Sequence, residues 1–453
     1  MVAPEFQAIV LAAGKGSRLT EVLEERPKCL LPIGIYPLIW YTLKMLQTHG
    51  FTEAIVLVLE NEKIEIQQRL EKTQLKLKID FCSISGDSDV GTADALRQIV
   101  ERIKTDFVLL SCDTIMEFSL YHVLKSFRKH NATIVSLLVH SDDQDFVIPG
   151  PKMKNKLELD LFGICPTSKR LVFMGSASDF ENIFKLPGHL LRQHESVELC
   201  SGLLDAHVYV MKKWMIDYIE ASSNISSLKG ELLPYILKRQ LYTSLNSQQT
   251  QMDKAISEIN MITKSNDIFR LISNSEIDKK MSDSSIFNQE PPFGNNLLGC
   301  YAVTAPKNTF GVRVNTLSAF YLANRQIYNV FSSIVDSPVT TLIAPNCDIN
   351  SNQVSKTAVG EQTVIHEKTS ITSSTIGANC VIKPKVLILT SILMDNVIVE
   401  ESVVIENCIL SDNSIIKSGS ILRNCLIGAN YIVSQNSQKD FVHLSNSKDF
   451  MEI

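Results

Sequence analysis

The sequence lacks the features that mark secreted, membrane-spanning and nucleic-acid-binding proteins. Its 44 Lys and Arg residues do not outnumber its 49 Asp and Glu residues, so the charge balance predicts neither a nucleic acid nor a membrane as partner. No apolar run reaches the roughly 18 residues that span a bilayer. The apolar run at residues 8–13 ends at Gly14 and Lys15, which is unlike a secretory signal. We therefore expect a soluble, cytosolic protein.

The ten cysteines of the 453-residue chain include no CxxC pair. Disulfide frameworks and zinc sites use close, regular cysteine spacings, so the scattered pattern predicts buried free thiols in a reducing compartment. The nine histidines include no HExxH pair, and His189 and His194 are placed so that they would not share a helical face. The sequence therefore predicts no metal site built from cysteine or histidine.

Residues 6 to about 240 alternate short apolar runs with longer amphipathic stretches, which is typical of βαβ units on a mainly parallel sheet. We expect helices at Leu38–His49 and Thr316–Val330, the second of which closes a first domain at residues 1–335. Between residues 243 and 298 the composition shifts to Ser, Asn, Gln and isolated charges, which predicts a mobile polar excursion. The expected strands are Phe6–Ala12, Ala54–Leu59, Ile79–Ser83, Phe107–Cys112, Thr133–Val139 and His207–Val210.

From about residue 341, aliphatic residues recur at nearly six-residue steps with small or turn-forming residues between them. Each short strand would point one such residue inward, so about three hexads per coil predict a parallel β-helix of roughly four or five coils in a second domain, residues 341–453. The alternative, a β-sandwich, would show turns about every 8–12 residues. The recurring positions are Val359, Ile365, Ile371, Ile376, Ile382, Ile388, Ile392, Ile398, Val404, Ile409, Ile415, Ile421, Leu426 and Ile432.

A glycine-containing segment, Leu11–Leu19 (LAAGKGSRL), directly follows the first expected strand, and Pro27-Lys28 and Leu30–Pro32 come after it. Glycines let the backbone approach a phosphate, and Arg18 and Lys28 could neutralise its charge. A glycine turn alone is a weak signal, because any βα connection can use one. With Arg and Pro-Lys at this spacing, the segment resembles the signature of the sugar-nucleotide pyrophosphorylase (nucleotidyltransferase) superfamily. The resemblance implies an α/β domain with a Rossmann-type mixed sheet, followed here by a left-handed β-helix of hexapeptide repeats.

Two later segments resemble the same superfamily. Gly91–Leu96 (GTADAL) is similar to its nucleoside-contacting segment, where glycine at a helix start permits close approach. Leu109–Asp113 (LLSCD) is similar to the strand end whose Asp holds the catalytic Mg²⁺, an ion that prefers carboxylate oxygen. Taken alone, Asp113 would more often be a helix cap or turn residue, but its place after an apolar run in the matching order favours the resemblance. The resemblance implies a vestigial nucleotide pocket with a vestigial metal position at Asp113; its residues are Gly14, Gly16, Arg18, Lys28 and Gly91.

Parts of the catalytic set of this superfamily are missing. Active members carry a second metal-binding Asp before the last helix of the domain, and Arg313 of Val312–Thr316 stands at that position. The Glu-Lys-Pro segment that meets the sugar phosphate is replaced by Met174–Ser176. Because nucleotidyl transfer depends on the complete set of cations and metal ligands, we expect no catalytic residue and no bound metal. Asp205 could supply a ligand, but a structural residue at a strand edge is the reading we favour.

Two further side chains could have either a catalytic or a structural role. His366 is the histidine inside the repeat and could serve as a base, as in some β-helix enzymes, but a solvent-facing turn position is favoured. Cys112 beside Asp113 could be a nucleophile, yet no His lies near it in sequence, and a buried strand end explains it better.

Within the superfamily, the chain resembles the family of gamma subunits of eukaryotic translation initiation factor 2B over nearly its whole length, the polar excursion excepted. The matching segments are Pro37–Tyr41, Gly91–Asp94, Leu110–Asp113, Gly202–His207, Arg313–Thr316, Ala323–Gln326 and Met451–Ile453. The resemblance implies a non-catalytic subunit of the complex that exchanges GDP for GTP on initiation factor 2. It also implies a heterodimer with the epsilon subunit through both domains, and alpha, beta and delta subunits in the larger complex.

In that family the exchange chemistry belongs to the epsilon subunit, which implies that this chain scaffolds epsilon and supports docking of the substrate. The sequence ends at Ile453, soon after the repeat, so we expect no separate exchange domain. The resemblance, with its vestigial pocket, also implies no cofactor. The alternative is an active nucleotidyltransferase that makes an NDP-sugar from an NTP and a sugar 1-phosphate. An intermediate possibility is a pocket that binds a nucleotide only as a regulatory ligand.

Overall fold

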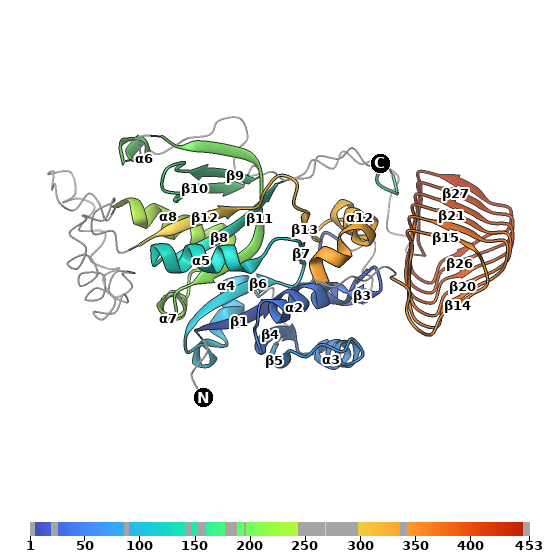
Figure 1. Cartoon of the computed structure of the whole chain (residues 1–453), viewed down its shortest axis with the longest axis horizontal. Coiled ribbons are helices and arrows are strands. Elements are labelled where there is room, and N and C mark those ends of the chain that lie inside the picture. Colours follow the sequence, from blue (N-terminus) through green and yellow to red (C-terminus); the bar gives the residue numbers. More distant parts are fainter. Residues whose placement is uncertain are drawn as a thin grey trace.

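A computed structural model describes residues 5–19, 26–85, 90–140, 147–151, 160–176, 188–193, 196–242, 268, 298–335 and 342–446. The chain forms an α/β domain followed by a column of stacked short strands, which lie side by side in Figure 1. Apart from residues 268 and 298, the expected polar excursion at 243–298 lies outside the described residues, as does the connection at 336–341.

The α/β domain is built on a nine-stranded mixed sheet with the order β10-β9-β11-β6-β1-β4-β5, in which β8 also pairs with β11 and β12 pairs with β8. The central strands β1 (Phe6–Leu11), β4 (Glu53–Leu59), β5 (Lys78–Ile84) and β6 (Asp106–Ser111) are parallel, as expected. The other strands are β8 (Ile134–His140), β9 (Asp160–Ile164), β10 (Leu171–Ser176), β11 (Glu198–Met211) and β12 (Cys300–Thr304). β11 is longer than the expected His207–Val210 and runs antiparallel to β6, β8 and β9.

Helices cover both faces of this sheet, which explains why its central strands are apolar on both sides. Along β1, Ala8 and Val10 belong to one hydrophobic cluster and Ile9 to the other. The first cluster includes residues of α2 (Leu38–Thr48), α5 (Leu120–His130) and α12 (Leu317–Val335). The second includes residues of α4 (Thr92–Arg97), α7 (Trp214–Ala221) and α8 (Leu233–Tyr242). Shorter or more peripheral are η1 (Lys28–Leu30), α3 (Lys63–Glu71) and α6 (Gly188–Gln193).

The helix expected at Thr316–Val330 is α12, and it extends to Val335. No helix among the described residues is long and apolar enough to cross a membrane. The ten cysteines are all unpaired, and eight of them are buried.

The second domain consists of three parallel sheets of six strands each, as expected of a left-handed β-helix. One sheet contains β15 (Gln353–Ser355), β18 (Ser370–Thr372), β21 (Leu387–Leu389), β24 (Val404–Glu406), β27 (Ile421–Arg423) and β30 (Gln438–Asp440). The others run from β14 (Asp348–Ile349) to β29 (Ile432–Val433) and from β16 (Ala358–Val359) to β31 (His443–Leu444). Six strands per sheet correct the expectation of four or five coils. The difference arises because polar residues fill most of the first and last coils.

Register explains the inward rows of the β-helix. Ile371, Ile388, Ile405 and Leu422 pair in succession along one sheet and are fully buried. Asparagines stack at one corner, where Asn396, Asn413 and Asn430 adopt left-handed backbone angles. Asparagine tolerates that conformation better than other non-glycine residues. The amide of Asn396 also donates to Asn413 (3.0 Å) and that of Asn413 to Asn430 (3.2 Å).

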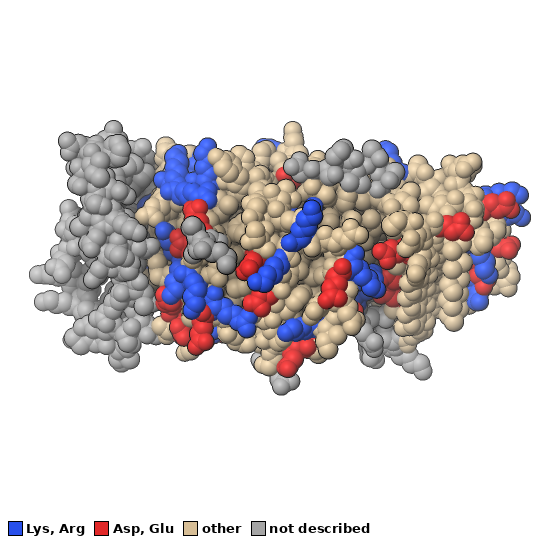
Figure 2. Space-filling model, turned by 60° about the horizontal axis from the view of Figure 1, so that its bottom comes forward, with Lys and Arg blue, Asp and Glu red and all other residues tan. Residues whose placement is uncertain are grey.

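Partly buried ion pairs join the two domains. Arg26 Nη2 lies 2.8 Å from Asp395 Oδ2 and 2.9 Å from Asp412 Oδ2, and Arg69 Nη2 lies 3.2 Å from Asp395 Oδ2. A hydrogen bond also joins the domains: the Tyr321 hydroxyl of α12 donates to Asn407 Oδ1 of the β-helix, with 2.5 Å between the oxygens. In the view of Figure 2, acidic and basic side chains lie beside one another over the α/β domain, and the middle of the β-helix is mostly uncharged.

The packing of the β-helix predicts a contrast between an inward and an outward isoleucine. Ile388 is fully buried and Ile432 is 55% exposed. Ile388→Ala should lower the free energy of unfolding of the β-helix by about 2–5 kcal/mol, because the lost contacts and the cavity add together. Ile432→Ala, the matched control, should change it by less than about 0.5 kcal/mol. Urea denaturation followed by circular dichroism measures both values, and equal effects would contradict this packing.

Candidate functional site at the carboxyl ends of the central strands

The site lies where β1 and β6 end at the same edge of the sheet. Leu11 pairs with Ser111, so the loop after β1 and the residues after β6 leave this edge together. Asp113 follows β6 and is 1% exposed. Directly after it, β7 (Thr114–Met116) pairs antiparallel with β13 (Gly311–Arg313), and this pairing sets Arg313 opposite Thr114. The parallel pairing of β1 with β6 and the antiparallel pairing of β7 with β13 thus bring segments that are distant in the sequence to Asp113.

Two cations hold the Asp113 carboxylate. Lys28 Nζ, from η1, donates a short hydrogen bond to Oδ2. Arg313 Nε lies 3.3 Å from both Oδ1 and Oδ2. Burial by itself would raise the pKa of Asp113, but the charges of Arg313 and Lys28 outweigh it and hold that pKa far below its ordinary value. Asp113 is therefore an ionised carboxylate whose charge is already balanced inside the protein.

His207 completes the cluster as a neutral side chain. Arg313 Nη1 lies 2.8 Å from His207 Nε2. Because guanidinium only donates, Nε2 must accept, which leaves the proton on Nδ1. Burial and then the charge of Arg313 lower the pKa of His207 well below its ordinary value. His207 has a φ of 51° at an irregularity of β11, so the local backbone turns the ring into the site.

Asp205 is not a strand-edge residue, contrary to our expectation. It lies on β11 within the interior of the sheet, pairs with Leu138 of β8 and is 3% exposed. Its carboxylate accepts a short hydrogen bond from the Tyr209 hydroxyl and one of 2.9 Å from the His207 amide. Burial raises the pKa of Asp205. These bonds occupy both carboxylate oxygens, so Asp205 serves the structure of β11.

The residues around Asp113 do not fit a magnesium ion. Mg²⁺ in phosphoryl-transfer sites is held by carboxylates and phosphate oxygens. Here one carboxylate faces Lys28 and Arg313, and both cations would repel a divalent ion. Within the described part of the chain, no group of three or more His, Cys, Asp and Glu side chains could hold a metal.

The glycine loop leaves the same sheet edge but keeps its own conformation. Gly16 has a φ of 67°, which favours glycine, and its carbonyl accepts from the Leu19 amide at 2.8 Å. Gly14 and Arg18 are exposed. The structure thus brings Lys28 and Asp113 together, with Gly14, Gly16 and Arg18 on the adjoining loop. Residues 20–25, which connect this loop to Lys28, lie outside the described residues.

Gly91 serves the packing of the chain on itself. A Cβ atom at Gly91 would lie 2.2 Å from the Ser226 carbonyl oxygen. That carbonyl accepts from the Ala93 amide at 2.8 Å, and the Leu228 amide donates to Thr92 Oγ1 at 2.9 Å. Residues 226–228 therefore cover the start of α4, the element to which the resemblance assigned a nucleoside contact.

Comparisons with known proteins match the two domains separately. Residues 7–146 match the family described as nucleotidyl transferase, and residues 339–438 match the left-handed β-helix domain of the eIF2B epsilon subunit. The chain is 35% identical over 250 residues to translation initiation factor eIF2B subunit gamma of Schizosaccharomyces pombe, covering 54% of each chain. It is 29% identical over 240 residues to that of Caenorhabditis elegans, covering 52% of this chain and 59% of the other.

A third match is longer. Subunit gamma of Dictyostelium discoideum is 24% identical over 406 residues, which cover 83% of this chain and 88% of that protein. This chain is similar to the eIF2B gamma subunits. The matched region spans only about half the length of the Schizosaccharomyces pombe and Caenorhabditis elegans proteins.

Other side chains of this eIF2B gamma relative lie away from the cluster. Met174–Ser176 ends β10, which pairs antiparallel with β9. Cys112 is buried, and burial raises the pKa of its thiol to about 12, so it is no thiolate nucleophile at neutral pH. His366 follows the short strand β17 (Val364–Ile365) and is partly exposed. The His189 and His194 side chains lie outside the described residues.

Sequence reasoning missed His207 and Ser226 as parts of the site. His207 stands in the LLDAHVYV stretch that drew attention to Asp205, but nothing in its spacing indicates Arg313 as its partner. Ser226 contributes a backbone carbonyl, which leaves no side-chain signal. Both contacts join segments far apart in the chain, so only the folded arrangement reveals them.

The neutral state of His207 predicts a pH dependence of stability. The folded pKa lies well below the ordinary value, so the unfolded state takes up a proton that the folded state does not. Stability from this group is present above about pH 6.5 and is lost as pH falls, by up to about 1.4 kcal/mol per unit. His207→Asn tolerates the left-handed backbone and should remove this slope between about pH 6.5 and 5.

Urea denaturation at a series of pH values measures the slope. His122→Asn is the matched control, because His122 is exposed on α5. The control should keep the wild-type slope. A slope that is the same in wild type and His207→Asn would show that His207 is not held neutral.

Proposed function

We propose that this chain is a non-catalytic subunit of a guanine-nucleotide exchange factor that exchanges GDP for GTP on translation initiation factor 2. The similarity to proteins named eIF2B subunit gamma supports the assignment to translation initiation. In this proposal the chain pairs with an epsilon subunit through both domains, works with alpha, beta and delta subunits, and acts in the cytosol. It requires no cofactor.

The Asp113 cluster is the observation that carries the non-catalytic part of the proposal. Nucleotidyl transfer needs positive charge at the transferred phosphoryl group, usually as a metal ion positioned by carboxylates. Lys28 and Arg313 neutralise the negative charge of the Asp113 carboxylate, and Arg313 also donates to His207. A metal or a phosphate would have to break these contacts. The retained glycine loop then has a structural role only, and Gly14, Gly16 and Arg18 are remnants of a nucleotide pocket.

A subunit without catalytic residues can still raise an exchange rate. Exchange is faster whenever the complex binds the nucleotide-free form of the GTPase better than the nucleotide-bound form, and each subunit that adds such contacts contributes. Ion pairs and hydrogen bonds join the two domains, so the domains together offer one continuous surface. This surface is suited to hold the epsilon subunit and to help dock the substrate.

An active nucleotidyltransferase remains the second candidate, because residues 7–146 match the nucleotidyl transferase family and the Gly14–Arg18 loop is present. This candidate predicts an NDP-sugar from an NTP and a sugar 1-phosphate. Arg313 at the second metal position argues against it, as does the short bond from Lys28 to Asp113. The two candidates differ in a product that can be measured.

The first test is release of pyrophosphate from purified protein with ATP, CTP, GTP or UTP, Mg²⁺ and a panel of sugar 1-phosphates. We expect no release above the background without protein, because the metal position is filled by Arg313. Turnover that persists through purification and disappears in Asp113→Asn would establish the transferase instead.

The second test measures exchange with the epsilon subunit of the same organism. Co-expressed with epsilon, this chain should co-purify at equal stoichiometry and increase the rate of GDP release from initiation factor 2 over that of epsilon alone. Arg18→Ala changes an exposed residue of the glycine loop and should leave the rate within about twofold, well under the tenfold that 1.4 kcal/mol would give. Failure to co-purify, together with no rise in rate, would refute the scaffold role.

A further inference from the structure

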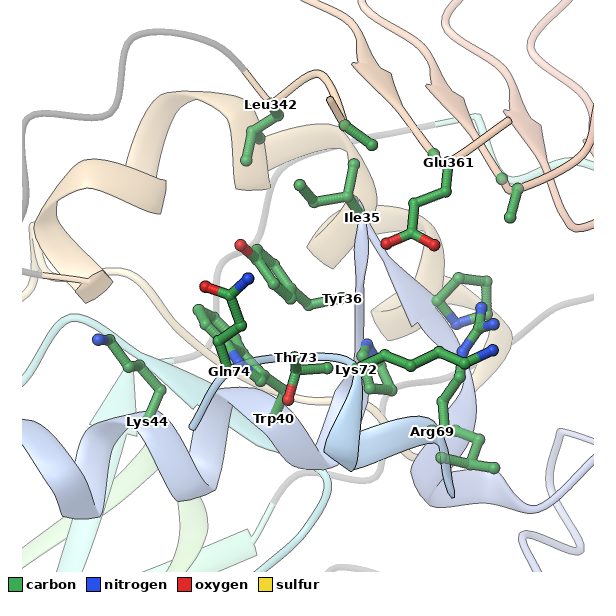
Figure 3. A pocket seen from close by; sticks show the side chains of 18 of the residues that line it. Ile35, Tyr36, Trp40, Lys44, Arg69, Lys72, Thr73, Gln74, Leu342 and Glu361 are labelled. Carbon is green, nitrogen blue, oxygen red and sulfur yellow. The ribbon is translucent and has the colours of Figure 1, made fainter. Parts of the chain in front are cut away.

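A cavity lies between the two domains, apart from the Asp113 cluster. Its volume is about 490 Å³, within the range of pockets that hold small organic ligands. The lining comes from α2, the end of α3 with the loop after it, the end of α12 and the first coils of the β-helix, as Figure 3 shows. Lys28, Asp113 and Arg313 do not contribute to it.

Aromatic rings form one wall of this interdomain cavity. Tyr36 and Trp40 stack with ring centroids 3.8 Å apart and planes 7° apart. Phe331 lies parallel to both, with its centroid 5.8 Å from that of Tyr36 and 6.1 Å from that of Trp40. All three residues line the cavity. Aromatic walls of this kind favour a ligand with a planar ring.

Charged side chains stand on either side of the aromatic wall. In Figure 3, Lys44 lies on one side, and Lys72 and Arg69 lie on the other, where Glu361 reaches in from the β-helix. Arg69 already pairs with Asp395. Within the described part of the chain, the Lys44 ammonium has neither an ion pair nor a hydrogen bond. Lys44 is half-buried on α2, so an anion beside it would be partly shielded from water.

The loop after α3 adds polar groups to the same space. Gln74 has a φ of 54°, an unusual backbone conformation for this residue, and its amide lies next to Tyr36 and Trp40 in Figure 3. Such backbone conformations concentrate at ligand-binding positions. The amide of Gln74 can both donate to and accept from a ring with polar edges.

We propose that this interdomain cavity binds a nucleoside monophosphate. The base lies against the wall of Tyr36 and Trp40. The phosphate pairs with Lys44, on one side of this wall. The site differs from the glycine-loop pocket and does not rest on the exchange function proposed above, since it follows from the cavity alone.

The test uses full-length protein with adenosine 5′-monophosphate and guanosine 5′-monophosphate as probes. The chain has two tryptophans, so Trp214→Phe leaves Trp40 as the single reporter. Saturable quenching of its fluorescence is expected with at least one of the two probes. Calorimetry on the wild-type protein should give the same dissociation constant, which keeps the test valid if Trp214→Phe does not fold. Adenosine and inorganic phosphate should each bind at least about tenfold more weakly, because each keeps only part of the contacts.

Matched variants locate the ligand. Lys44→Ala should weaken binding by about tenfold or more through loss of the charge-assisted bond. Lys76→Ala is the control, because Lys76 is exposed in the loop after α3 and does not line the cavity; it should change binding by less than about twofold. Arg18→Ala should leave binding intact. The proposal fails if neither nucleotide binds, if Lys44→Ala binds like wild type, or if Arg18→Ala abolishes binding.

Discussion

The buried Asp113 carboxylate is the constraint from which the rest of the candidate site follows. A carboxylate that is 1% exposed can stay ionised only if nearby cations and donors replace the lost water. Lys28 and Arg313 do so, and each comes from a different segment. The cluster therefore fixes η1, the end of β6 and β13 relative to one another. Burial and the charge of Arg313 together keep His207 neutral, because both lower its pKa.

The proposed loss of nucleotidyl transfer has a physical basis in this arrangement. Where the resemblance places a second carboxylate for a divalent ion, the protein has a permanent cation of its own. The substitution of Asp by Arg converts a position that attracts metal into one that neutralises Asp113 internally. Ser226 likewise fills the space beside Gly91 that the resemblance assigns to a nucleoside. In both places the chain supplies the contacts that a ligand would otherwise make.

The ion pairs from Arg26 to Asp395 and Asp412 have a corresponding role between the domains. They hold the first domain against a β-helix whose short strands are rigidly stacked, and the interdomain cavity lies along this junction. Its aromatic wall and half-buried lysine have no counterpart in the motifs of the glycine loop.

The sequence predicted the fold because each domain carries a periodic signal. Hexad steps identified the β-helix, and apolar runs identified the central strands β1, β4 and β6. The coil count was wrong because the last coil places Gln438–Asp440 and His443 where aliphatic residues stood before, so the period could no longer be read. The order of the motifs showed that Arg313 stands where the superfamily has its second metal-binding Asp. Its contacts with Asp113 and His207 were not, because they depend on β13 pairing with β7 across almost 200 residues of chain.

Electron paramagnetic resonance of Mn²⁺ tests the central claim most directly, because Mn²⁺ occupies oxygen-ligand sites like those of Mg²⁺. The protein is titrated with Mn²⁺ in the presence of excess GTP, and wild type is compared with Asp113→Asn. If Lys28 and Arg313 neutralise Asp113, wild type and variant should retain the same small amount of protein-bound Mn²⁺. A stoichiometric Mn²⁺ site in wild type that disappears in Asp113→Asn would contradict the account.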